Sequence, residues 1–108
     1  FVAYKPSGIG SNLFLSKLKR KYNNKKAGFS GTLDPFAKGA LIIGFGSHTK
    51  LFRFLNKAPK RYRATLWLGA KSDSLDTEMI ESVDLVDEFL ESKVVEVLDS
   101  IKGELEYE

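Results

Sequence analysis

The chain has 108 residues, of which 43% are hydrophobic and none is cysteine, and this length suits one compact domain with a modest core. The lack of cysteine excludes a disulfide framework and thiolate metal sites, a single histidine argues against structural zinc, and no apolar run reaches the roughly 18 residues that span a membrane. Residues 1–63 carry 14 Lys or Arg and one acid, whereas residues 64–108 carry 3 basic and 13 acidic residues. The strongly basic first half favours a polyanionic partner such as nucleic acid. The alternative is a solvated basic face that only aids solubility.

The first predicted elements are a short strand and a basic helix. Residues 1–5 read as an apolar strand that the Pro6-Ser7-Gly8 turn ends. Ser11 is predicted to be the N-cap of a helix that ends near Tyr22. Cations fill one set of positions in this helix, and the apolar side chains at helical spacing should face the core. These apolar positions are Phe14, Leu15, Leu18 and Tyr22.

Residues 28–39, Gly-Phe-Ser-Gly-Thr-Leu-Asp-Pro-Phe-Ala-Lys-Gly, hold the most informative side chain. Asp34 is the only acidic residue in the first 72 positions. Pro35 disfavours the helical conformation at Asp34 and pushes it to an extended one. An isolated carboxylate therefore sits at a rigid bend among cations. The alternative is an ordinary Asp-Pro turn, in which Asp34 bonds its own backbone.

Two further strands and a short helix are predicted next. Residues 41–46 form a short apolar run, typical of a buried strand, and a helix opens at Thr49. Residues 61–68 alternate in polarity, which predicts a half-buried strand with Tyr62 and the apolar residues on one face. His48 is interpreted as a solvated loop residue, because no Ser, Cys or second His is placed to work with it.

The remaining sequence is acidic. Asp73 and Asp76 do not form a calcium loop, because the further oxygen ligands and the terminal Glu are missing at the required spacing. Residues 82–86 are predicted to form a strand. Ser92 is predicted to cap a helix whose acids form a solvated face, and another strand should begin at residues 104–108.

Several of these strings resemble the motifs of one enzyme family. Residues 28–39 resemble the Gly-x-x-Gly-Thr-Leu-Asp-Pro-x-Ala-x-Gly signature of the TruB-type tRNA pseudouridine synthases. Other matches follow the family order: Lys5-Pro6 with Gly8 and Ser11, Gly46 with Thr49-Lys50, Lys60-x-Tyr62, and Leu68-Gly69 through Asp76. The chain departs from the family at a few positions, where it carries Tyr4, Gly10, Phe29 and Met79.

The resemblance implies an isomerase that converts a T-loop uridine of tRNA to pseudouridine with no cofactor and no metal. Asp34 would be the catalytic residue, which must be ionised. Tyr62 would stack on the target base after the base leaves the RNA stack. Lys5 and Lys60, like other cations of the first half, would bind phosphates.

Two more residues receive roles from the resemblance. Asp76 would help to hold an active-site arginine. Phe29 stands where the family commonly has a histidine that takes part in RNA contact and base flipping, so it would supply a wedge or stacking face without the histidine's hydrogen bonds.

The implied fold is α+β, with a mixed, largely antiparallel sheet flanked by helices. Residues 1–108 would form the N-terminal part of the catalytic domain, since the family's later strand with a conserved arginine does not occur in this sequence. We therefore expect residues 1–108 alone to be inactive or nearly so. The enzyme is expected to be a cytoplasmic monomer.

Three alternatives stay open from the sequence. A non-catalytic RNA-binding module would explain the basic half but not the single acid in the glycine-rich loop. A protein-interaction domain would use its basic and acidic halves to bind partners and would leave no footprint on RNA. A guide-RNA-dependent pseudouridine synthase of the dyskerin type would share the chemistry.

Overall fold

The computed structural model describes residues 1–56, 59–86 and 90–104. The chain divides into two compact units, Phe1–Arg63 and Ala64–Glu108. This boundary coincides with the change from basic to acidic sequence, so each unit has its own charge. Among the described residues, no helix has the length and apolar character to cross a membrane.

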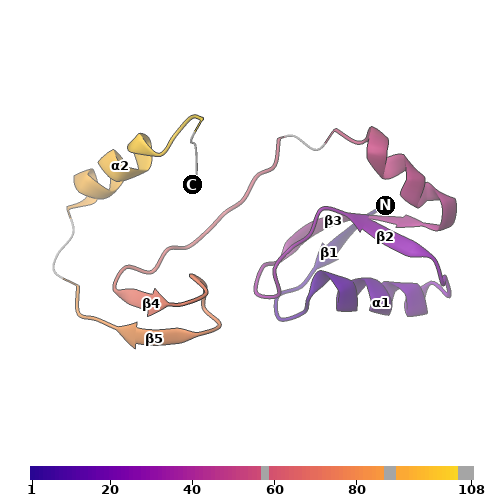
Figure 1. The fold of residues 1–108 in the computed structure, drawn as a ribbon, viewed down its shortest axis with the longest axis horizontal. Coiled ribbons are helices and arrows are strands. Elements are labelled where there is room, and N and C mark those ends of the chain that lie inside the picture. The colour runs from indigo at the N-terminus through magenta and orange to yellow at the C-terminus, as the bar shows by residue number, and fades with distance from the viewer. Residues whose placement is uncertain (57–58, 87–89, 105–108) are drawn as a thin grey trace. The chain divides into compact units, whose positions relative to one another are not determined.

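The first unit is built on a three-stranded antiparallel sheet in the order β1-β3-β2 (Figure 1). Its strands are β1 (Val2–Lys5), β2 (Ala27–Ser30) and β3 (Gly39–Phe45). The apolar run of β3 makes it the central strand, and Leu41 and Ile43 are each only 2% exposed. The predicted strands at residues 1–5 and 41–46 are confirmed, whereas β2 was not predicted.

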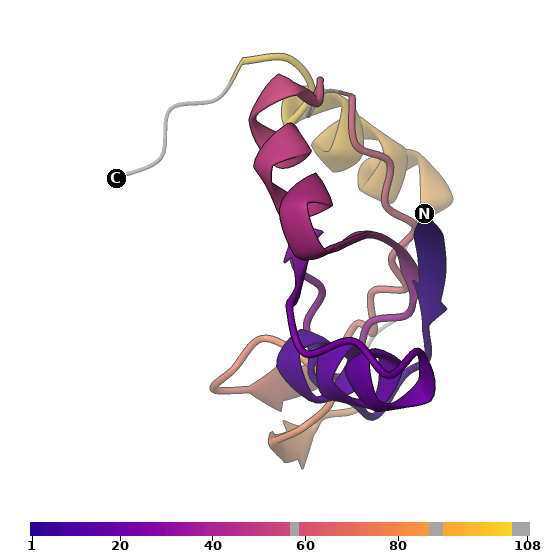
Figure 2. The same cartoon turned by 90° about the vertical axis from the view of Figure 1, so that its right-hand side faces the viewer.

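Two helices cover the two faces of this sheet. Helix α1 (Ser11–Lys21) and the 3₁₀ helix η1 (Gly46–Phe54) lie on opposite sides of the strands in both views (Figure 1 and Figure 2). The ring of Tyr22, at the end of α1, lies 5.5 Å from that of Phe45 in β3. The apolar side chains predicted within α1, Phe14, Leu15 and Leu18, are half-buried.

The start of α1 differs from the prediction. Its N-cap is Gly10, which makes no side-chain cap, and Ser11 is the first helical residue. The predicted Ser11 cap is therefore wrong, because the hydroxyl of Ser11 bonds Leu33 instead of the helix N-terminus.

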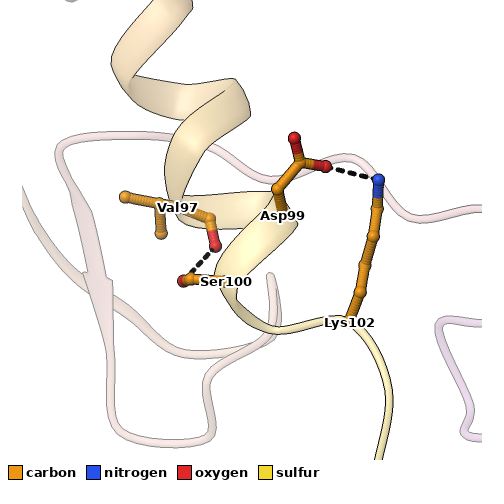
Figure 3. A network of polar contacts seen from close by, with 4 residues as sticks. All are labelled: Val97, Asp99, Ser100 and Lys102. Carbon is orange, nitrogen blue, oxygen red and sulfur yellow. Dashed lines mark hydrogen bonds and ion pairs between the residues drawn. The ribbon is translucent and has the colours of Figure 1, made fainter.

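The second unit contains a two-stranded antiparallel hairpin and a helix. β4 (Ala70–Ser72) pairs with β5 (Ile80–Val83), with an irregularity between Lys71 and Ser72. Helix α2 (Glu91–Ser100) starts after Leu90, so the predicted Ser92 cap is wrong. At its end the Ser100 hydroxyl donates to the carbonyl of Val97 at 2.6 Å, and Lys102 pairs with Asp99 (Figure 3).

Two predicted strands need comment in this unit. The strand predicted at residues 82–86 is partly confirmed, since β5 ends at Val83. The strand predicted at residues 104–108 lies outside the described residues apart from Glu104, which has no regular structure.

The strand predicted at residues 61–68 is wrong for this structure. These residues have no regular secondary structure, and all eight are exposed. Alternation gives a strand only when a neighbouring strand takes up its backbone hydrogen bonds. No such partner exists among the described residues. The α+β class with antiparallel strands is confirmed by the sheet and helices of both units.

Candidate active-site loop

Asp34 lies in an exposed turn of the first unit, directly after Leu33. Its carbonyl accepts a hydrogen bond from the backbone N–H of Ala37 at 3.1 Å, which closes the turn. Within the described part of the chain, its carboxylate has no hydrogen-bond or ion-pair partner. The side chain is therefore open to solvent and to a ligand, although Asp34 does not line the pocket at the end of α1 or the pocket between β3 and η1.

The turn around Asp34 is held by residues 5–11, which we call the clasp. The ammonium of Lys5 donates to the carbonyls of Ile9 at 2.6 Å, Pro6 at 2.9 Å and Pro35 at 3.3 Å. The backbone N–H of Gly8 donates to the same Pro35 carbonyl at 2.8 Å. One carbonyl next to Asp34 thus receives two donors from the clasp.

Serine hydroxyls of the clasp hold both sides of the same turn. The Ser11 hydroxyl donates to the carbonyl of Leu33 at 2.8 Å and accepts from the N–H of Leu33 at 3.0 Å. The Ser7 hydroxyl donates to the carbonyl of Phe36 at 2.7 Å. Asp34 is therefore bracketed by bonds at Leu33, Pro35 and Phe36, which fix its backbone while its side chain stays free.

Lys5 is unusual because it is charged and fully buried, with 0% of its surface exposed. Burying an ammonium group is costly unless its donors are satisfied. Here three carbonyls take up its three N–H donors. No donor is left for a phosphate in this structure, so the phosphate contact of Lys5 stays a prediction.

The other predicted site residues of the first unit are not joined to Asp34. Phe29 is half-buried in β2, opposite Ile43 of β3, and therefore lies on the face of the sheet that carries Ile43. Lys60 and Tyr62 are exposed, Tyr62 to 72%, in a stretch without regular structure. No hydrogen bond or ion pair among the described residues connects these three side chains to the clasp, and their substrate-binding roles stay predictions.

Asp76 lies in the second unit, in the turn between β4 and β5. Its carboxylate accepts from the Ser74 hydroxyl at 2.7 Å and from the backbone N–H of Glu78 at 2.8 Å. The hydrogen bond from Ser74, which has the larger effect, and the hydrogen bond from Glu78 hold the pKa of the Asp76 carboxyl below its ordinary value. Asp76 thus stabilises its own turn, and its contact with an arginine stays a prediction.

Sequence reasoning missed the way in which residues 5–11 act on the Asp34 turn. The available signal was the fixed separation of the two motifs, since Lys5 stands 29 residues before Asp34. It could not reveal which side chain meets which carbonyl. The described residues contain no group of three or more His, Asp or Glu side chains that could hold a metal ion.

A model of the TruB family pseudouridylate synthases, for the N-terminal domain, matches residues 19–108 of the chain. The chain belongs to the TruB family. The match covers the second unit and the first unit from residue 19 onwards, including the Asp34 turn, whereas the clasp lies before its first residue.

Three TruB relatives called "tRNA pseudouridine synthase B" extend the match over the clasp. The protein from Sulfurimonas denitrificans is 74% identical over all 108 residues. The proteins from Nitratiruptor sp. and Campylobacter jejuni (strain RM1221) are 60% and 56% identical over 107 residues. The chain spans 39–40% of the length of these relatives.

Proposed function

We propose that the protein carrying this chain converts a uridine of tRNA to pseudouridine and that Asp34 performs the chemistry. The observation that carries the proposal is the Asp34 turn: an exposed, unpartnered carboxylate on a backbone clamped at three neighbouring carbonyls. Membership of the TruB family and the names of the relatives support the same activity.

The reaction is an isomerisation and needs no external reagent. The bond between C1′ of the ribose and N1 of uracil breaks, the base turns, and C1′ bonds to C5. The proton leaves C5, and N1 finishes with a proton. Asp34 would act either as the nucleophile that attacks the nucleotide or as the base that removes a proton. In either role the carboxylate must be held at the reacting nucleotide, which a clamped backbone favours.

We further propose that the target lies in the T-loop and leaves the base stack before reaction. Tyr62 would stack on the extruded base and Phe29 would act as a wedge, with Lys60 on a phosphate. The enzyme would work as a cytoplasmic monomer, and residues 1–108 alone would be inactive.

The test is tritium release from tRNA labelled at C5 of uracil, with the full-length protein that carries this sequence. Asp34→Asn keeps the size of the side chain but removes its charge, so turnover should fall below detection while tRNA is still bound. Asp99→Asn, at an exposed acid of α2, is the matched control and should turn over normally.

Three results would count against the proposal. Normal turnover by Asp34→Asn would remove Asp34 from the chemistry. Tight tRNA binding without turnover by the wild-type protein would favour a non-catalytic RNA-binding module, and turnover that requires a guide RNA would favour the dyskerin type.

A further inference from the structure

A second candidate site lies at the opposite end of α1 from the clasp. An open pocket of about 280 Å³, which we call the basic pocket, is lined by Lys19, Arg20, Asn23, Asn24 and Lys25. Three of these residues are cations, two are amides and none is an acid. Because α1 rises about 1.5 Å per residue over its 11 residues, the basic pocket lies roughly 15 Å along the helix from Ser11.

The backbone at the end of α1 builds this pocket. Asn23 has a left-handed φ of +46°, and this conformation reverses the chain after the helix. The N–H of Asn24 bonds the carbonyl of Lys19 at 2.9 Å, and the N–H of Asn23 bonds that of Arg20 at 3.2 Å. This is the Schellman arrangement, in which the carbonyls of Lys19 and Arg20 accept hydrogen bonds from residues beyond the helix. It brings Lys25 of the following loop to the same pocket as Lys19 and Arg20.

The polar groups of the basic pocket are mainly unused donors. Among the described residues, the side chains of Lys19, Arg20 and Lys25 make no hydrogen bond or ion pair, and the ion pairs that the described residues form all lie in the second unit. The side-chain oxygen of Asn24 accepts from the N–H of Lys26 at 3.1 Å, which leaves its NH₂ group to donate. Asp34 is the only acid of residues 1–63, so the first unit offers little to neutralise these cations.

The helix dipole accounts for part of this charge but not for the pocket. Cations in the last turn of a helix interact favourably with the negative end of its dipole. In α1 these cations are Lys19, Arg20 and Lys21. The dipole gives no reason for Lys25, which lies beyond the helix. A donor-rich concavity of one charge sign is the arrangement that binds phosphate, with arginine presenting a planar fork and lysine a point charge.

We propose that the basic pocket binds a phosphodiester group of the tRNA backbone, away from the nucleotide that reacts at Asp34. This inference rests on the proposed function and adds an RNA contact on the far end of α1. One end of α1 holds the Asp34 turn through Ser11, and the basic pocket at the other end would hold a phosphate. The helix would thereby fix the position of the tRNA relative to the reacting carboxylate.

The experiment compares two triple variants of the full-length protein with an in vitro tRNA transcript. The pocket variant is Lys19→Gln, Arg20→Gln and Lys25→Gln. The control variant is Lys17→Gln, Lys21→Gln and Arg53→Gln, which removes equal charge from the same unit without touching the pocket. Binding is measured as a function of salt, and turnover is measured as kcat and KM. Circular dichroism verifies folding, and the single variant Lys25→Gln, outside the helix, replaces the triple if the triple unfolds.

We expect the pocket variant to raise Kd and KM about tenfold or more at low salt and to leave kcat unchanged. Its plot of log Kd against log salt should lose about 0.7–0.9 in slope for each phosphate contact that disappears. The control variant should change the slope by less than half as much. Equal effects of both variants, or a loss of kcat with unchanged salt slope, would overturn the proposal.

These outcomes are independent of the catalytic proposal. If the wild-type protein binds tRNA but shows no turnover, the proposed function fails. The difference in salt slope between the pocket variant and the control variant still tests whether the basic pocket binds phosphate. If Asp34→Asn loses turnover and both triples bind alike, the catalytic proposal stands and the pocket proposal fails.

Discussion

At the residue scale, Ser11 has a different role from the N-cap role that its sequence context predicts. Ser11 resembles an N-cap by position but is 6% exposed and bonds both backbone groups of Leu33. A hydroxyl that donates to one backbone group and accepts from another can replace a strand neighbour for a single residue. Ser11 is therefore a positioning residue for the Asp34 turn.

Replacing Ser11 by alanine tests this role. Ser11→Ala leaves the N–H and carbonyl of Leu33 without these partners, so we expect a loss of about 1–3 kcal/mol in unfolding free energy. Looser placement of Asp34 should also lower kcat about tenfold to a hundredfold. Chemical denaturation and tritium release from labelled tRNA measure the two effects.

The control for Ser11→Ala is on the same helix. Ser16 is exposed and its hydroxyl donates only to the carbonyl of Asn12 at 3.0 Å. Ser16→Ala should leave both stability and kcat nearly unchanged. If Ser11→Ala lowers stability and leaves kcat intact, Ser11 is structural only and does not position Asp34.

At the element scale, η1 packs closely on the sheet because two opposite strand positions are glycine. Gly28 of β2 pairs with Gly44 of β3, and both face Phe52 and the start of η1. A Cβ at Gly44 would lie 2.9 Å from the Phe52 ring and 3.3 Å from the backbone of His48. Gly44 therefore sets the distance between η1 and β3.

Gly44→Ala should destabilise the first unit, because a methyl group there forces η1 away from the strands. Overpacking of this kind costs about 1–3 kcal/mol, which denaturant unfolding of the full-length protein measures. Gly28→Ala is the matched control, since its Cβ would meet Phe52 and Thr49 at an ordinary 3.4 Å. Equal destabilisation by both variants would show that Gly44 carries no special steric role.

Comparison of the elements shows what the sequence can predict. β1, α1, β3 and η1 follow from local patterns of apolar spacing and glycine, and each was predicted within a few residues. β2 was missed because Ala27–Ser30 is short and has no alternating pattern. The Asp34 turn was recognised from its motif, whereas the clasp depends on contacts between segments more than 20 residues apart, which local patterns do not encode.

At the scale of the whole molecule, residues 61–68 show that a strand is not a local property. Their alternation is correct for a strand, yet they form no ladder and remain exposed. The chain spans only about 40% of its relatives' length, and we expect sequence beyond residue 108 to supply the missing neighbour.

Hydrogen exchange tests this expectation. In residues 1–108 alone, the amides of residues 61–68 should exchange without protection, while those of β3, which is paired on both sides, should be slow. In the full-length protein the same amides should become protected. Lack of protection in both proteins would show that residues 61–68 do not become a strand.

The carbonyl shell around Lys5 has a consequence for which substitutions the loop can accept. Three peptide oxygens surround one ammonium, much as a crown ether holds a cation, and no carboxylate takes part. Such a cage selects by the shape of the ion as well as by its charge. An arginine at position 5 would keep the charge but would bring five donors on a planar group into a space that offers three acceptors. We therefore expect Lys5→Arg to destabilise the fold, although it replaces one basic side chain by another.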